Sequence, residues 1–225
     1  MSLRPRVTFT QYRGHALVTA PASEPITADE LRAHLRETVD GLPYEQADAL
    51  IAEAREMIEE TTGLAMINQT HRMALDYWPV GREQWWDGVR DGAISDMGVA
   101  NGIRAVTLPR YPLSSITSVN VYDEASNATS IVVADTFDID TYSKPGRMVL
   151  QSGATWPIAL RGSNAIEITY VAGFGATSAS VPAILRRAVK QVAAYLYSHA
   201  GDDCTADDAL GAAASLLSAY SVRRV

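Results

Sequence analysis

The apolar positions of the chain repeat every three to four residues near both ends and every second residue between them. The clearest helical pattern runs from Tyr44 to Thr62, with an apolar stripe opposite an acidic face, and Gly63 is placed to end it as a C-cap. An earlier helix is predicted to begin at Thr27, whose hydroxyl can cap it. Glu30 lies three positions later and can reach back to the cap amide. The stripe of the longer helix consists of Tyr44, Ala47, Leu50, Ile51, Ala54, Met57, Ile58 and Thr61.

Helical spacing returns after Pro182, a favourable residue for the first turn of a helix. A last helix is predicted to begin at Thr205, which can cap it, with Asp207 and Asp208 in its first turn. The apolar positions of the two helices are Ile184, Leu185, Ala188, Val189, Val192, Ala193 and Leu196 in the first and Leu210, Ala213, Leu216, Leu217 and Tyr220 in the second.

The middle of the chain alternates apolar and polar positions in short runs that are separated by turn residues, as expected of an antiparallel β module. One stretch, 79–102, carries five glycines and is expected to be a long loop. Strands are predicted at 70–78, 103–108, 116–122, 130–134, 137–142, 147–151 and 165–171.

These patterns predict an α+β fold in which N- and C-terminal helices pack together as a small bundle around an inserted antiparallel β module. The expected organisation is an extended N-terminal arm (1–25), a helical domain (26–66 with 180–225) and the β module (67–179). The longest apolar runs are far shorter than the ~20 residues that cross a bilayer, so no membrane span is expected.

Composition and charge narrow the classes of function. Of 225 residues, 47% are hydrophobic and 20% are charged, which predicts a folded chain. The formal net charge of −7 argues against binding DNA through its phosphates, but an acidic wall suits a conduit through which DNA slides. A single cysteine, Cys204, leaves no internal disulfide, and no cleaved signal peptide is expected.

Several segments, taken in order, resemble the head–tail connector (head-completion or adaptor) proteins of tailed phages, prophages and gene transfer agents. No segment is specific alone, and their joint order and spacing carry the resemblance. They are Leu17–Pro21, Glu24–Thr27 through His34–Arg36, Ala49–Ile51 through Glu59 with Thr62–Gly63, Leu108–Pro109, Tyr111–Leu113, Gly146–Arg147, Trp156–Pro157, Ile168–Gly175, and Val181–Pro182 with the helix that follows.

The resemblance implies a structural protein of the virion, made in the bacterial host cytoplasm and not an enzyme. Such a subunit joins copies of itself in a ring, typically a dodecamer, that docks on the portal protein at the capsid vertex. The ring seats the next tail or stopper protein and leaves an axial channel for DNA, without sequence-specific binding. In this family the helical part builds the ring and the C-terminal segment commonly engages the portal. No cofactor, metal or membrane partner is implied.

The acidic face of the helix at 44–62 is the first candidate site. If it lines the channel, the carboxylates of Glu53, Glu56 and Glu60 would repel passing DNA; a solvated outer face is the plainer alternative.

Candidates for contacts with neighbouring subunits or the portal lie in two places. The aromatic pair Trp85 and Trp86 sits in the glycine-rich stretch, where packing onto its own domain is the alternative. The others belong to the C-terminal segment and are Leu216, Leu217, Tyr220, Arg223 and Arg224.

Local motifs for catalysis or metal binding are missing. The four histidines show no metal-binding spacing, and neither Gly173–Gly175 nor Gly98–Gly102 continues as a nucleotide-binding loop. Asp138 and Asp140 share a strand face, for which solvent exposure is a simpler explanation than acid–base chemistry. A small hydrolase is therefore the least favoured hypothesis, behind a β-rich module that binds a tail protein or a host glycan.

Overall fold

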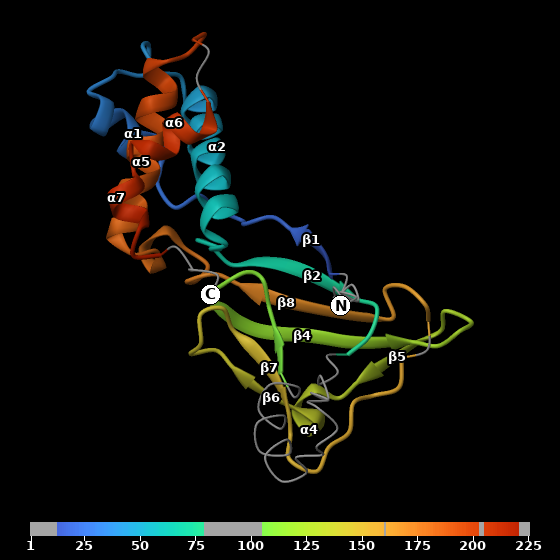
Figure 1. Cartoon of the computed structure of the whole chain (residues 1–225). Helices are drawn as coiled ribbons and strands as arrows, with labels where there is room; N and C mark the ends of the chain where they lie inside the picture. Colours follow the sequence, from blue (N-terminus) through green and yellow to red (C-terminus); the bar gives the residue numbers. More distant parts are fainter. Residues whose placement is uncertain (1–12, 79–104, 160, 203–204, 221–225) are drawn as a thin grey trace, which may run out of the picture.

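The computed structural model describes residues 13–78, 105–159, 161–202 and 205–220, to which all structural statements below refer. A helical part and a β part lie end to end, so that the molecule is elongated, with both described chain ends near the β part or the junction (Figure 1).

The helical part joins segments from both ends of the chain. Helices α1 (Ala28–Leu35) and α2 (Tyr44–Thr62) pack against each other and against α5 (Ala183–Ser198), while α6 (Ala206–Gly211) and α7 (Ala214–Leu217) pack on α5. One apolar core runs through them, because the stripes predicted from the sequence face inward. Its fully buried members include Leu31, Leu42, Ala47, Ile51, Ala54, Ile58, Leu185, Ala188, Val189, Val192 and Ala193.

Helix ends follow the predicted capping residues with one difference. The Thr27 hydroxyl accepts a hydrogen bond from the Glu30 amide (3.2 Å), and Gly63 ends α2 with φ +76°. The Glu30 carboxylate, however, turns to the cations of α5 (2.5 Å to Arg186) instead of reaching back to the cap. The reciprocal capping box forms at α6, between Thr205 and Asp208.

The β part contains two antiparallel sheets. The larger has the order β1-β2-β8-β4-β5, with β1 at Arg13–Thr19, β2 at Gln69–Leu75, β8 at Ile166–Ala172, β4 at Leu113–Tyr122 and β5 at Ala128–Ile131. The smaller has the order β3-β7-β6, with β3 at Ala105–Thr107, β7 at Arg147–Leu150 and β6 at Phe137–Asp140. A helical turn, α4 (Val133–Thr136), precedes β6, and a 3-10 turn, η1 (Ser178–Ser180), leads into α5.

A second apolar core fills the β part. It is made by inward-facing residues of both sheets, among them Met73, Val119, Ile166, Ile168, Val106 and Met148. An aromatic group adds to it, in which Trp78 stacks on Trp156 (4.6 Å between ring centroids) next to Phe137.

The α+β fold class is confirmed: helices from the two ends of the chain pack together, and the antiparallel sheets are formed mainly by the residues between them. Three local expectations need correction. Within the expected N-terminal arm, residues 13–19 form the edge strand β1, paired with β2. The run 130–134 is divided between β5 and α4, and the last helix is interrupted between α6 and α7 just after Gly211, a residue that weakens helix interiors. No described helix is long and apolar enough to cross a bilayer.

Candidate functional site

Glu53, Glu56 and Glu60 lie on the solvent-exposed face of α2. At 100° per residue these three positions, together with Glu45, occupy an arc of roughly 80° opposite the buried stripe. Side-chain exposure is 71% for Glu56 and 81% for Glu60, so the carboxylates are well hydrated. The structure therefore places the predicted acidic residues together on one exposed face, which we call the acidic face (Glu45, Glu53, Glu56 and Glu60).

Arg55 and Glu59 are charged residues outside the predicted apolar stripe, yet neither lies on the exposed face of the helix. Both are buried, at 5% and 6% exposure, and they pair with each other at 3.0 Å. Glu24 completes the arrangement by pairing with Arg55 at 2.8 Å. Burial alone would lower the pKa of Arg55, but the two carboxylates outweigh it and the pKa is raised.

Glu59 also ties α2 to the sheet. Its second carboxylate oxygen accepts hydrogen bonds from the Met66 amide (2.7 Å) and from the Gln69 side chain (3.0 Å), which lead into β2. We call Glu24, Arg55, Glu59 and Gln69 the polar joint. Because every buried charge in it has a partner, it fixes the helical part on the β part.

An open groove runs beside the acidic face. It lies between α2 and the segment 23–29, with residues of the turn η1 at one end, and has a volume of about 830 Å³. Ala49 and Ala52 line it together with three carboxylates, those of Glu24, Asp29 and Asp48. The side of the helical part that carries α2 is thus acidic over both its ridge and its groove.

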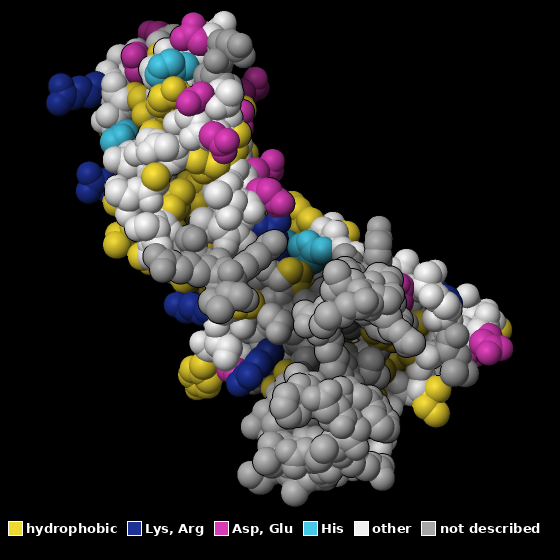
Figure 2. Space-filling model, viewed as in Figure 1, with side chains coloured by type: hydrophobic (Ala, Val, Ile, Leu, Met, Phe, Trp, Pro, Cys, Tyr) yellow, Lys and Arg dark blue, Asp and Glu magenta, His cyan; other side chains and the backbone are white. Residues whose placement is uncertain are grey.

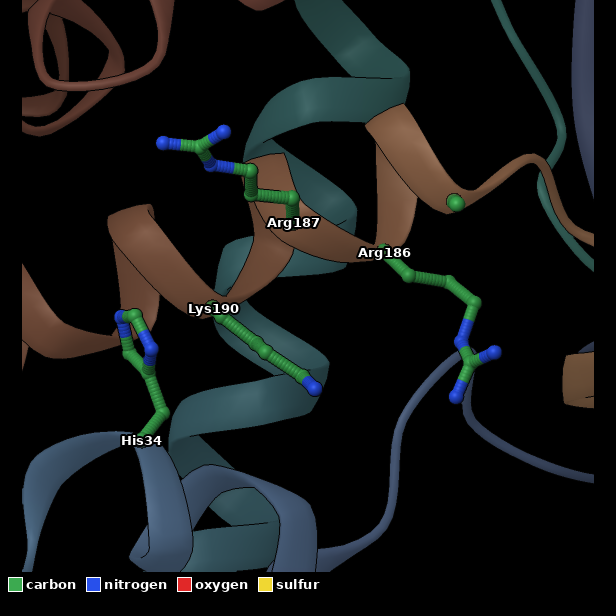
Figure 3. A pocket seen from close by; sticks show the side chains of 5 residues that line it. His34, Arg186, Arg187 and Lys190 are labelled. Carbon is green, nitrogen blue, oxygen red and sulfur yellow. The ribbon is translucent and has the colours of Figure 1, made fainter.

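The opposite side of the bundle is basic. A pocket of about 320 Å³ is lined by His34 of α1 and by Ala183, Arg186, Arg187 and Lys190 of α5. In Figure 3 the side chains of Arg186 and Lys190 extend toward the α1 side of the pocket, His34 approaches from α1, and Arg187 points away from them. We call His34, Arg186, Arg187 and Lys190 the basic face.

Glu30 neutralises part of this face. Its carboxylate accepts a hydrogen bond from Arg186 at 2.5 Å and lies 3.6 Å from the Lys190 ammonium. These cations lower the pKa of Glu30 against the raising effect of its burial. Arg186 and Lys190 face this one carboxylate, and Arg187 adds a third cation at the pocket's edge, so the pocket keeps a net positive charge and can receive an anionic group.

A histidine pair at the junction of the two parts escaped the sequence analysis. His15 of β1 stacks on His71 of β2 (4.9 Å between centroids), and its Nε2 lies 3.1 Å from the Tyr170 hydroxyl of β8. His71 is 3% exposed, and burial, with smaller effects of His15 and Arg110, lowers its pKa to about 4. Strand pairing brings these three side chains together, although His15 and Tyr170 are 155 residues apart in the sequence. The local spacing of residues therefore could not indicate this group.

The C-terminal candidates divide into two groups. Leu217 is buried in the helical core (6% exposed), and Leu216 and Tyr220 are half-buried against it, while their contacts with neighbouring subunits or the portal stay a prediction. The Tyr111 hydroxyl donates to the Tyr220 carbonyl, which holds this segment on the β part. Trp85, Trp86, Arg223 and Arg224 lie outside the described residues.

The aspartates considered as an acid–base pair are engaged in local contacts or exposed. Asp140 is engaged in a local turn with Ser143 and Arg147, whose hydrogen bonds lower its pKa, and Asp138 is exposed. No group of three or more metal-ligating side chains occurs in the described ranges. What the structure offers is two charged surfaces suited to binding.

Comparisons with known proteins give a consistent result for the fold. No family model matches the chain, and no curated protein matches it. Solved structures do match: a chain of the neck of an empty gene transfer agent (GTA) particle computed with C6 symmetry has a TM-score of 0.69 and 24% identity over 94% of this chain and 97% of that chain.

Two further chains have the same identity and cover 94% of this chain. One, from the virion of a native GTA particle, has a TM-score of 0.68 and is covered to 96%. The other, from the neck of a native GTA particle computed with C12 symmetry, has a TM-score of 0.64 and is covered to 97%. At this identity the likeness establishes a shared fold over nearly the whole chain.

Proposed function

We propose that the chain is a structural subunit of the neck of a phage-like particle, where copies of it form a ring between capsid and tail. The observation that carries the proposal is the match to neck chains, which spans both the helical and the β part rather than one common module. The role is carried over from these chains by analogy of fold over nearly the whole chain.

The finer assignment extends this proposal. The ring docks on the portal protein, seats the next tail or stopper protein, and leaves an axial channel through which DNA passes without sequence-specific contacts. The formal charge of −7 supports a wall that does not retain DNA. The lining of that channel by Glu53, Glu56 and Glu60 stays a prediction, and the inference below gives the same face a competing role.

The assignment is tested by particle assembly. Deleting the gene from its phage or prophage is expected to give filled or empty capsids without tails, and supplying the protein in trans should restore tailed particles. Electron microscopy of the purified protein, alone and mixed with portal-bearing capsids, should show a ring at the portal vertex. Normal tailed particles from the deletion strain would refute the proposal.

A further inference from the structure

The charged faces of the helical part point in opposite directions. α2 and α5 pack against each other through their buried stripes, so the exposed side of each helix faces away from the other. Figure 2 shows the result: Asp and Glu side chains gather along the edge formed by α2 and over the tip, while Lys, Arg and His side chains project from the opposite edge. The bundle is electrostatically two-sided.

Each face also holds charge that has no ion-pair partner among the described residues. Among the described residues, Glu45 and Glu53 of the acidic face and Arg187 of the basic face have no ion pair within 4.0 Å. In the same pocket the Nε atom of Arg186 is buried and has no hydrogen-bond partner in the described parts of the chain. Unpaired charges of opposite sign on opposite sides are a feature that a partner of matching pattern would use.

We propose that the basic face of one copy docks on the acidic face of the next copy, head to tail. The inference rests on the proposed function and deepens it by naming the surfaces that join neighbouring subunits. A ring with one copy per position needs two different, mutually complementary surfaces on each subunit, facing away from each other. The helical part carries such a pair.

A second copy of the chain is the partner that suits these faces best, because every copy carries both an acidic face and a basic face. Two acidic faces repel each other, and so do two basic faces, so a two-fold dimer through either face is disfavoured. An acidic face meeting a basic face repeats without conflict from subunit to subunit. The contact should weaken as salt rises, because exposed charges are screened.

This assignment competes with the channel-lining role of Glu53, Glu56 and Glu60. A face that is covered by the neighbouring copy cannot border the axial channel. Measuring ring assembly distinguishes the two roles. Reversing charge at an interface weakens the ring itself, whereas reversing charge on a channel wall leaves the ring intact and changes the passage of DNA.

The first experiment uses the lysine content of the chain. The sequence has two lysines, Lys144 in the β part and Lys190 in the basic face, and a carbodiimide joins a lysine to a carboxylate that touches it. An equal mixture of isotopically light and heavy protein is cross-linked alone and on portal-bearing particles, then digested and analysed by mass spectrometry. Light–heavy links from Lys190 to Glu45, Glu53, Glu56 or Glu60 are expected, with Lys144 as the internal control. Their absence in both samples overturns the inference.

The second experiment exchanges charges between copies. Arg187→Glu removes the net positive charge of the basic face, and Glu53→Lys with Glu56→Lys removes the net negative charge of the acidic face. Each variant alone should self-associate at least tenfold more weakly than wild type by sedimentation velocity. An equal mixture should recover association, because the intact acidic face of one variant can dock on the intact basic face of the other, and the substituted positions are again opposite in sign. Lys144→Glu, and Glu124→Lys with Asp135→Lys, are matched controls on the β part; their self-association should equal that of wild type.

The outcomes separate the two proposals. If rings form at the portal vertex but neither reversal weakens them, the face assignment fails and the neck function stands. If the protein is absent from the portal vertex, the neck function fails, whatever the cross-links show. Thermal unfolding of each variant, expected to match wild type, establishes that lost association is not lost folding.

Discussion

The helical part and the β part each bury their apolar residues in a core of their own, whereas the contacts that join the two parts include buried polar groups. Each has its own core, and consecutive residues after α2 alternate between the two: Leu64 and Met66 pack into the helical core, while Ala65 packs into the β core. Across the junction the contacts include the buried polar groups of the polar joint. Apolar cores tolerate small shifts, whereas a charged joint with fixed hydrogen bonds holds one orientation.

The largest expected effect comes from breaking the polar joint. Glu59→Ala removes one of the carboxylates that pair with buried Arg55 and leaves the Met66 amide and the Gln69 side chain without this acceptor. We expect a loss of about 3–5 kcal/mol in the free energy of unfolding, from the lost buried ion pair and the two buried donors left unsatisfied. Urea unfolding monitored by tryptophan fluorescence measures it.

The matched control is Glu53→Ala on the exposed face of the same helix, expected within about 0.5 kcal/mol of wild type. Equal stability losses in the two variants would show that the joint is not the feature that holds the parts together.

The second effect tests how closely the chain passes itself at the junction. Gly173, just after β8, has φ +148°, and a Cβ there would lie 2.5 Å from the Asn68 amide nitrogen. Gly173→Ala should cost about 2–4 kcal/mol of unfolding free energy, from backbone strain plus the clash. Thermal denaturation measures it against Gly162→Ala, where a Cβ meets no atom within 4 Å. A Gly173→Ala protein as stable as the control would contradict the close approach.

The sequence predicted the two parts better than their junction. Helical stripes and caps such as Thr27 and Gly63 are local signals, and local signals carry most of the information about where elements begin and end. The buried roles of Arg55 and Glu59 could not be predicted, because a charged residue on a helix is expected in water unless a partner distant in sequence covers it. Strand β1 was missed because it lies at a sheet edge with both faces largely exposed, which leaves no alternation to detect.

Of the two charged surfaces, the acidic face could be predicted from the sequence and the basic face could not. The acidic face follows from helical spacing, so Glu53, Glu56 and Glu60 were found. The basic face combines α1 and α5, whose sequences are about 150 residues apart, and no pattern within one helix indicates that His34 lies near Lys190.

A third test uses the pH dependence of the junction. The pKa of His71 is about 4 in the folded protein and near 6.5 in the unfolded chain, so the folded state binds the proton more weakly. Stability is therefore fully present above about pH 6.5 and falls as the pH drops toward 4, by up to about 3 kcal/mol from this residue. Urea unfolding across this range should show that slope in wild type.

Substituting His71 tests whether this residue causes the pH dependence of stability. His71→Phe keeps a buried ring and removes the titration, so the fall in stability between pH 6.5 and 4 should be smaller than in wild type. His34→Gln, at an exposed histidine of the helical part, should leave the wild-type slope. An identical slope in the His71→Phe protein would place the pH dependence elsewhere.

The smallest effect concerns a helix that depends on its cap more than on a core. α6 is six residues long and buries one residue, Ala209, so its first turn relies on the reciprocal bonds between Thr205 and Asp208. Thr205→Ala should cost about 1 kcal/mol, measured by thermal unfolding, and should raise amide hydrogen exchange in α6 without changing it in α2. Thr205→Ser, which keeps the hydroxyl, is the matched control and should retain most of the protection. Exchange that rises equally in α2 and α6 would mean that α6 is cooperative with the bundle, and that the helical part opens as one unit.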